Sequence, residues 1–223
     1  MGWIQMLHDR DWRGAEASYR RALELAPGNA MVLHRVSLLA GLTGRLEEAI
    51  TLARRAVEQD PLSAASYFFL GTILWSADRH EDAIAALRKS LELAPQRTAT
   101  HGFLSVVLLD RGRAEEALAE ALQEPEDWGR LYALAIIHHA AGRPVESEEA
   151  LQELIRTRAG DAAYQIAEVH AARGETNRAF EWLERARVQR DAGIAWAKVD
   201  PHLRSLHVDP RWAPFLQTMG LAD

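Results

Sequence analysis

Histidines are the first side chains in this sequence that suggest chemistry, because a neutral imidazole is a common metal ligand. His138 and His139 are adjacent, and neighbouring residues on a helix point about 100° apart, so the two cannot share one ion. His138 and His170 occupy equivalent positions of successive repeats, but no third ligand accompanies them. We therefore expect packed or partly exposed histidines and no metal site.

Paired carboxylates could in principle act as general acid and base. Each pair stands where a helix is expected to start, and negative charge is favourable at a helix N-terminus. A catalytic dyad repeated four times would make no sense, and the sequence has no nucleophile elbow, phosphate-binding glycine loop or zinc-protease helix motif. We therefore expect no catalytic residue, no cofactor and no enzyme activity. The pairs are Glu47-Glu48, Glu81-Asp82, Glu115-Glu116 and Glu148-Glu149.

The elements that carry these residues repeat with a period of 34 residues. Such a period, with glycine and proline at fixed places, is typical of a solenoid of helical hairpins. The pattern predicts helices over 30–42, 45–59, 66–77 and 80–94. It also predicts a shorter second helix in the fourth unit, where Pro125 follows Ala117 after 8 residues and not 12. The marker residues are Ala15, Ala49, Ala83, Ala117, Ser147 and Ala179, with turns at Gly44, Asp78, Gly112, Gly142 and Gly174.

Composition narrows the class of protein further. The chain of 223 residues has no cysteine and a net charge of −6, which argues against disulfides, thiolate chemistry and a nucleic-acid partner. No apolar run reaches the roughly 18 residues of a membrane span, and the first residues do not form a signal peptide. We expect a cytoplasmic protein without nucleic-acid or membrane partners.

Both ends depart from the repeat. Each repeat unit has a first and a second helix. In the first unit, only residues 1–9 remain for the first helix, about half of its usual length. We expect either a short native start or, preferably, a chain cut from a larger protein, and a second copy could cover the incomplete hairpin. At the other end, Asp200-Pro201 and Asp209-Pro210 each read as an N-cap followed by the first helical residue. Two short helices are expected there to cover the end of the stack.

The residues that recur at equivalent positions of successive units resemble the tetratricopeptide repeat over residues 1–190. Leu33 and Ser147 depart from the family pattern. The resemblance implies an all-α, right-handed superhelical solenoid of antiparallel helical hairpins, with a helical C-terminal cap over 191–223. The tail from Trp182 also resembles the end of bacterial signalling proteins whose N-terminal parts are winged helices, nucleotide cyclases or kinases. The matching residues are Gly71, Ser105, Ala135 and Ala167 in first helices, with the alanine column and Tyr19 in second helices.

In such a stack the first helices line a concave face, so equivalent positions of the first helices form columns on it. The resulting groove is aromatic and apolar, without the lysines and asparagines with which related domains clamp acidic chaperone tails. We expect it to bind a hydrophobic or aromatic peptide, or a helix of a partner protein. The alternative is that these side chains only pack between hairpins. The groove residues are His34, Phe68, Trp75, Leu109, Tyr132, Ile136, His139 and Tyr164.

The sequence therefore predicts a non-catalytic scaffold for protein–protein interaction. Two alternatives stay open: a C-terminal regulatory module of a larger signalling protein, and a repeat protein that associates with itself.

Overall fold

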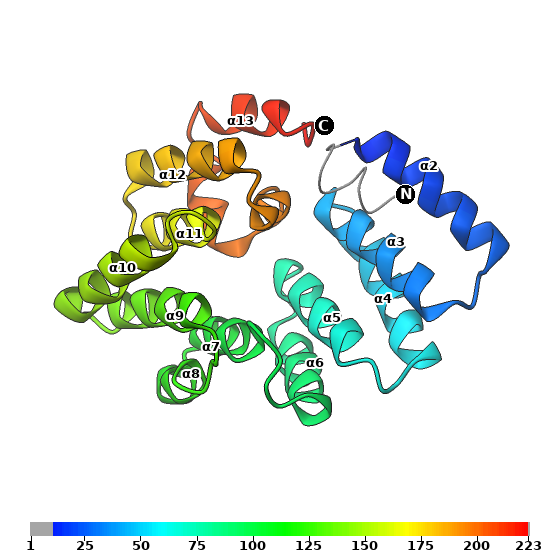
Figure 1. Ribbon diagram of the computed structural model, residues 1–223, viewed down its shortest axis with the longest axis horizontal. Helices are drawn as coiled ribbons and strands as arrows, with labels where there is room; N and C mark the ends of the chain where they lie inside the picture. Colours follow the sequence, from blue (N-terminus) through cyan, green and yellow to red (C-terminus); the bar gives the residue numbers. More distant parts are fainter. Residues whose placement is uncertain (1–10, 223) are drawn as a thin grey trace. The chain divides into compact units, whose positions relative to one another are not determined.

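The computed structural model describes residues 11–222, and these residues form helices, turns and loops without a β-strand. Successive helices pair as antiparallel hairpins (Figure 1). The prediction of an all-α solenoid of helical hairpins is confirmed, and its expected helix bounds lie within two residues of those observed. The half-length helix expected over 1–9 lies outside the described residues. The helices are α2 (Trp12–Leu25), α3 (Ala30–Leu42), α4 (Leu46–Gln59), α5 (Ala64–Ser76), α6 (His80–Leu93), α7 (Thr100–Asp110), α8 (Ala114–Ala121), α9 (Asp127–Ala140), α10 (Pro144–Arg158), α11 (Ala163–Ala172) and α12 (Thr176–Gln189).

The chain divides into two compact units. Unit 1 comprises Met1–Leu93, Ala195–Asp200 and Asp209–Asp223, and unit 2 comprises Ala94–Ile194 and Pro201–Val208. Unit 1 contains α2 to α6, and unit 2 contains α7 to α12. After residue 190, residues 191–194 and 201–208 belong to unit 2, and residues 195–200 and 209–223 belong to unit 1. The expected boundary of a C-terminal cap over 191–223 stays a prediction. No helix within residues 11–222 is long and apolar enough to cross a bilayer.

The turns inside the hairpins have the backbone that the sequence predicts. Gly44 has a φ of 89° and Gly112 one of 73°, a left-handed conformation that glycine adopts without steric cost. Asp78 occupies the equivalent turn of the third unit with a φ of 59°. Aspartate tolerates this region better than most residues, because its short polar side chain bonds locally.

Small residues let the two helices of each hairpin pack closely. The alanine column is fully buried, and Ser147 continues it by donating a hydrogen bond of 2.7 Å from its Oγ to the carbonyl of Ala135. A Cβ atom on Gly71 would lie 2.7 Å from Cγ of Leu87. A larger residue at this position would require Leu87 or the helix backbone to shift, since real Cβ contacts do not become so short.

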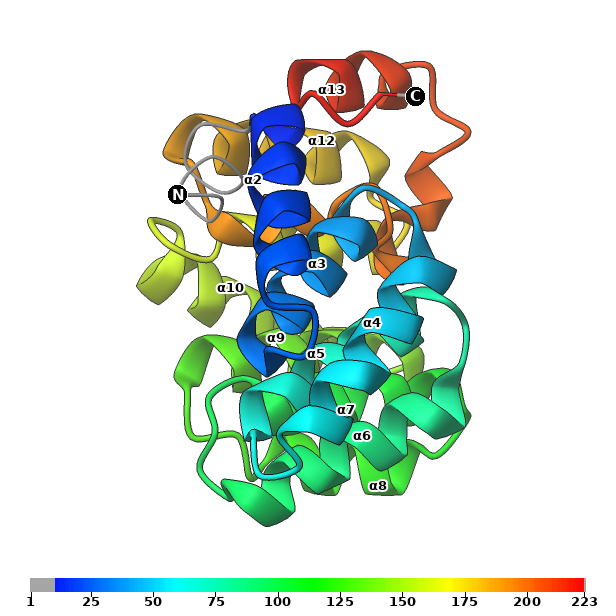
Figure 2. The ribbon, with the colours of Figure 1, turned by 90° about the vertical axis from the view of Figure 1, so that its right-hand side faces the viewer.

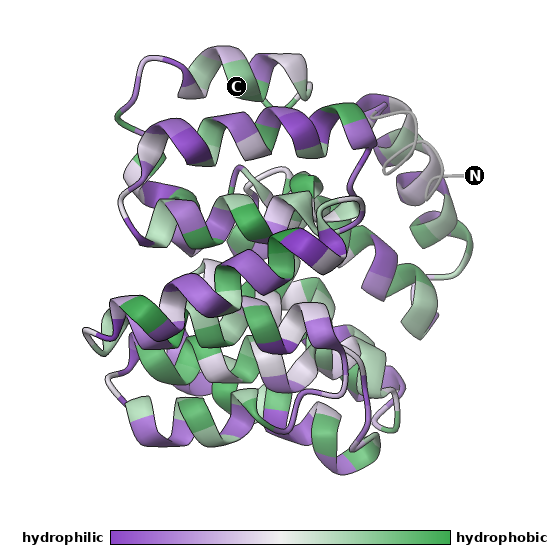
Figure 3. Ribbon diagram, turned by 60° about the vertical axis from the view of Figure 1, so that its left-hand side comes forward, coloured by the Kyte–Doolittle hydropathy of each residue, from purple (hydrophilic) through white to green (hydrophobic). Residues whose placement is uncertain are grey.

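The second helices α4 and α6 are amphipathic, with their buried residues on one face. Figure 3 shows hydrophilic and hydrophobic residues interspersed along the helices of the fold. The exposed faces of α4 and α6 carry ion pairs that join neighbouring hairpins of unit 1: Arg79 contacts Glu47 at 2.8 Å and Arg54 contacts Asp82 at 2.9 Å. Glu47 and Asp82, one residue from each of the first two acid pairs, therefore have a second structural role beside their place near helix N-termini.

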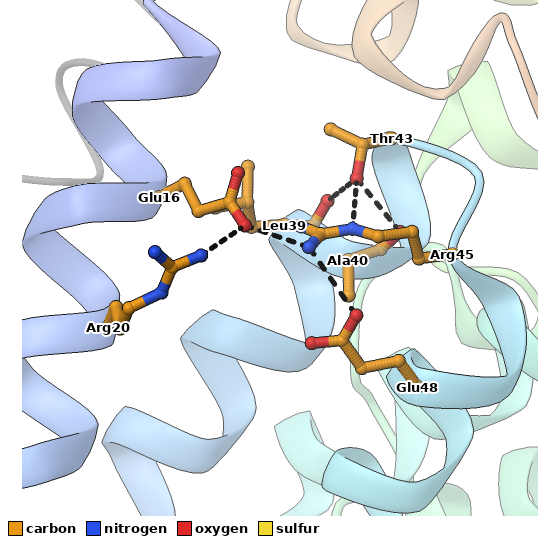
Figure 4. A network of polar contacts seen from close by, with 7 residues as sticks. All are labelled: Glu16, Arg20, Leu39, Ala40, Thr43, Arg45 and Glu48. Atoms are coloured by element: carbon orange, nitrogen blue, oxygen red, sulfur yellow. Dashed lines mark hydrogen bonds and ion pairs between the residues drawn. The ribbon is translucent and has the colours of Figure 1, made fainter.

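An arginine connects the first described helix to the next hairpin. The guanidinium of Arg45 lies 2.9 Å from Glu16 of α2 and 3.4 Å from Glu48 of α4 (Figure 4). Its Nε also donates to Oγ1 of Thr43 at 3.3 Å, and that hydroxyl donates to the carbonyl of Leu39. This network fixes α2 on the turn between α3 and α4.

The second helix of the fourth unit is short, as predicted, and a buried carboxylate follows it. Helix α8 ends at Ala121. Three residues later the side chain of Glu124 accepts hydrogen bonds from the backbone N–H groups of Ala99 at 2.9 Å, Gly102 at 3.0 Å and Glu126 at 3.2 Å. It thereby caps the start of α7, whose Ala99 has a left-handed φ of 68° and cannot supply a side-chain cap itself.

The tail contains two 3₁₀ helices and a last α-helix: η1 (Ala192–Trp196), η2 (Pro201–Leu206) and α13 (Trp212–Thr218). Helix η2 begins at Pro201, as predicted. Asp209, however, is not the N-cap of α13, which begins two residues later than expected. Asp209 Oδ1 instead accepts the backbone N–H of Arg211 at 2.9 Å, and the Arg211 guanidinium binds both carboxylate oxygens.

The two parts of the tail lie at different hairpins. Helix η2 contacts α11 in unit 2. In unit 1, the Trp12 indole N–H at the start of α2 donates a hydrogen bond of 2.9 Å to the carbonyl of Met219. Figures 1 and 2 both show α13 near this end of α2. The last helix therefore covers part of the first hairpin.

Candidate partner-binding surface

In unit 1, the first helices α3 and α5 bring aromatic side chains together. The His34 ring on α3 lies 5.0 Å from the Phe69 ring on α5, measured between centroids, and Phe69 lies 5.1 Å from Phe68 in an edge-on arrangement. His34 and Phe69 are half-buried, whereas Phe68 is 8% and Trp75 3% exposed. The accessible part of this predicted surface is thus the His34–Phe69 pair.

In unit 2, Tyr132 connects α9 to α11 and to the tail. Its hydroxyl donates a hydrogen bond of 2.8 Å to Oε1 of Glu168, and it lies 3.0 Å from Nδ1 of His202 on η2. The Tyr132 ring also lies 6.1 Å from the His202 ring and 6.5 Å from that of Phe103 on α7. The tyrosine is 1% exposed, because the chain's own η2 occupies the face that the sequence predicts for a ligand.

Tyr164 is covered by the residues just after α12. Its backbone N–H donates to Oδ2 of Asp191 at 3.0 Å, and Asp191 Oδ1 accepts the N–H of Gly193 at 2.9 Å. Burial raises the pKa of Asp191, although these N–H groups act in the opposite direction. A Cβ on Gly193 would lie 2.7 Å from Cδ1 of Tyr164, so only glycine allows this close approach.

The other predicted groove residues differ in burial. Ile136 is buried, Leu109 is half-buried and His139 is exposed. Together with His34, Leu109 and His139 are the predicted residues that keep accessible surface. Whether any of the eight contacts a partner stays a prediction.

His170, considered above as a metal ligand, has a partner within its own hairpin. Its Nδ1 lies 2.5 Å from Oε2 of Glu175, and Arg173 binds the other oxygen of that carboxylate at 2.8 Å. Burial lowers the pKa of His170 against the opposing effect of Glu175. Arg173 also contacts Glu148 at 2.7 Å. These ionisable side chains tie α11 to α10 and α12.

Sequence reasoning missed Phe69, Asp191 and His202. Phe69 stands one position beyond the predicted column, and only the contact with His34 reveals its place. Asp191 and His202 belong to the tail, where no repeat register assigns a face. Asp200-Pro201, the pair before His202, predicted a short helix. It did not predict that this helix would pack on α11.

Comparisons with known proteins agree with this fold. A family model described as tetratricopeptide repeat matches residues 7–61, 41–98 and 132–194, and a second model with the same description matches 98–123. No curated protein sequence matches the chain.

Solved structures also resemble the chain. TTC0263, a thermophilic TPR protein of Thermus thermophilus, has a TM-score of 0.65 at 17% identity over 76% of this chain and 94% of its own. MamA has a TM-score of 0.58 at 20% identity, covering 70% and 93%. YrrB, described as a TPR protein with an unusual peptide-binding site, has a TM-score of 0.51 at 19% identity, covering 79% and 95%. At these identities the likeness shows the fold alone.

Proposed function

Because the chain belongs to the tetratricopeptide repeat family, we propose that it is a non-catalytic scaffold whose first helices bind a peptide or a partner helix. Protein interaction is the general role of this repeat. The finer proposal, an apolar or aromatic ligand on the first helices, rests on the residues of this chain.

One observation carries the proposal: the half-buried His34 and Phe69 rings, 5.0 Å apart, connect α3 to α5 on the first-helix face of unit 1. Because the two helices are held in packed hairpins, the backbone that carries these rings is already ordered before a ligand binds. Aromatic side chains supply large contact areas, and partly exposed ones can still be covered by a ligand. An apolar or aromatic side chain of a peptide suits such a surface.

Affinity capture with a matched pair of variants tests this proposal. Three proteins serve as baits. They are the native chain, a His34→Ala/Phe69→Ala variant, and a Thr51→Ala/Glu58→Ala control on the exposed face of α4. All three baits would first be checked for the same helical content by circular dichroism. We expect a partner that the native and control baits retain and the ring variant loses.

Equal capture by all three folded baits would refute the assignment to this face. Where capture is selective, a synthetic copy of the partner's binding segment, titrated against the same three proteins, separates direct from indirect capture. A loss of about tenfold or more in affinity is expected for the ring variant, the scale of removing one contact residue.

The remaining sequence-based proposals concern context. We propose a cytoplasmic protein without a nucleic-acid partner, and the net charge of −6 supports the latter. A regulatory role inside a larger bacterial signalling protein remains the alternative that the Asp-Pro tail favours. Self-association through the first hairpin depends on residues 1–9, which lie outside the described part of the chain.

A further inference from the structure

Helix η2 rests on unit 2 in the manner of a bound peptide. Leu203 and Leu206 are fully buried, whereas Arg204, Ser205 and His207 are exposed. In a 3₁₀ helix, residues three apart lie on one face, so the two leucines form a single apolar edge. This edge faces unit 2, where η2 contacts α11.

A polar contact also joins η2 to the first helices, beside this apolar edge. Glu168 is 1% exposed, and a carboxylate so buried needs hydrogen-bond partners. It accepts the Tyr132 hydroxyl at 2.8 Å, and Nδ1 of His202 lies 3.0 Å from the same hydroxyl. The imidazole therefore joins a hydrogen-bonded pair that belongs to the first helices themselves.

The segment depends on these contacts for its structure. Helix η2 has six residues, and such short 3₁₀ pieces have no independent stability in water. His202, Leu203 and Leu206 are its buried or hydrogen-bonded side chains, while the first-helix side of the contact lies on α9 and α11. The occupied face and the occupying peptide are thus distinct structural parts.

We propose that the first-helix face of unit 2, around Tyr132 and Glu168, is a peptide-binding site whose resident ligand is the tail segment Pro201–Val208. A partner peptide with the same anchors, His-Leu-x-x-Leu, replaces the tail when it binds. The tail then sets the affinity that a partner must exceed, since only the fraction of molecules with an open site can bind. This inference rests on the proposed function of the first helices and extends it to a site that the chain itself closes.

Thiol labelling measures whether the tail leaves its site in the otherwise native chain. The natural sequence has no cysteine, so each variant carries a single thiol. Leu206→Cys reports on the buried edge of η2, Leu104→Cys on the buried core of α7, and Ser205→Cys on the exposed side of η2. We expect the Leu206→Cys thiol to react with a disulfide reagent at least about tenfold faster than the Leu104→Cys thiol and more slowly than the Ser205→Cys thiol, because local opening is less costly than global unfolding.

A free peptide tests replacement. The probe is a fluorescent peptide with the sequence of residues 201–208, and the protein is a Leu203→Ala/Leu206→Ala variant whose own tail has lost both leucine anchors. We expect this peptide to bind the variant, to bind the native chain at least about tenfold more weakly, and to accelerate labelling of Leu206→Cys. Adding Tyr132→Phe to the variant is expected to weaken binding up to about tenfold, because the peptide's histidine loses its hydrogen bond to the Tyr132 hydroxyl.

Three results would overturn the proposal. The first is equal labelling rates for Leu206→Cys and Leu104→Cys, which would make η2 part of the permanent core. The second is absence of peptide binding by a variant that keeps its helical content. The third is a doubling of the variant's mass in light scattering, which would assign the open site to a second copy. Capture through His34 and Phe69 in unit 1 is measured independently, so failure here leaves that test intact.

Discussion

Replacing Glu124 by alanine should destabilise unit 2 more than any replacement of an exposed glutamate. The Glu124 side chain is 1% exposed and accepts the backbone N–H groups of Ala99 and Gly102 at 2.9 and 3.0 Å. Both donors belong to buried residues at the start of α7. In Glu124→Ala they lose their acceptor. The missing side chain also leaves a void beside Gly129, on which a Cβ atom would lie 3.1 Å from Cγ of Glu124.

The magnitude follows from the two buried donors, because the third, the N–H of Glu126, belongs to a half-buried residue. Leaving one buried donor unsatisfied costs about 1–3 kcal/mol, and water entering the void offsets part of that cost. We expect Glu124→Ala to lower the free energy of unfolding by about 3 kcal/mol. Glu124→Gln keeps the volume and one acceptor oxygen, so about half of that loss is expected. The control, Glu115→Ala on the exposed first turn of α8, should change stability by less than about 0.5 kcal/mol.

Urea denaturation followed by circular dichroism measures the loss, and hydrogen exchange at the amides of Ala99 and Gly102 locates it. The local measurement matters because two compact units need not unfold in one step. We expect both amides to exchange at least about tenfold faster in Glu124→Ala than in the native chain. Unchanged exchange at Gly102, or a stability within about 0.5 kcal/mol of the native chain, would refute the capping role.

Other predictions concern the turns and the ionisable groups. Gly112→Ala should lower the free energy of unfolding by about 1–2 kcal/mol in urea denaturation, because the φ of this residue is 73° and no neighbour lies near the added Cβ. Asp78→Gly should raise it by about 0.5 kcal/mol, because glycine adopts the same turn without steric cost. Equal effects of the two variants would contradict the strain argument. Since burial holds the pKa of His170 below the ordinary 6.5, the unfolded chain binds more protons below that pH. The urea midpoint should therefore fall as pH drops through about 6.5, and less so in His170→Asn. The Arg211 side chain holds the pKa of Asp209 at about 2, so an NMR titration should show that pKa rising toward 3.8 in Arg211→Ala. The favourable contact is present above the ordinary pKa and is lost as pH falls through about 2.

Much of the fold follows from the period, because each hairpin packs against its neighbours and repeats their side-chain pattern. The alanine column and the turn glycines are local requirements, and they appear in the structure where the sequence predicts them. The register also places Tyr132 on the first-helix face, and the structure joins it by a hydrogen bond to Glu168 of the next first helix. These are the parts in which local sequence and fold agree.

The accessibility of the predicted site did not follow from the sequence. Periodicity assigns a residue to a face, but it does not reveal what covers that face. Tyr132 and Tyr164 are buried by η2 and by residues 191–194, whose positions depend on contacts distant in sequence. Glu124 likewise reads as a loop residue of a polar stretch, since its partners lie 22 and 25 residues earlier.

The contact between Trp12 and Met219 also has a consequence for the order in which parts of the chain fold. The two residues are separated by 207 positions, whereas hairpins of a solenoid otherwise contact only their neighbours. During synthesis α3 to α6 can form from local contacts as the chain emerges. The indole N–H of Trp12 must wait for its acceptor until the ribosome has added Met219, so unit 1 is completed only after the segments of unit 2 have been synthesised.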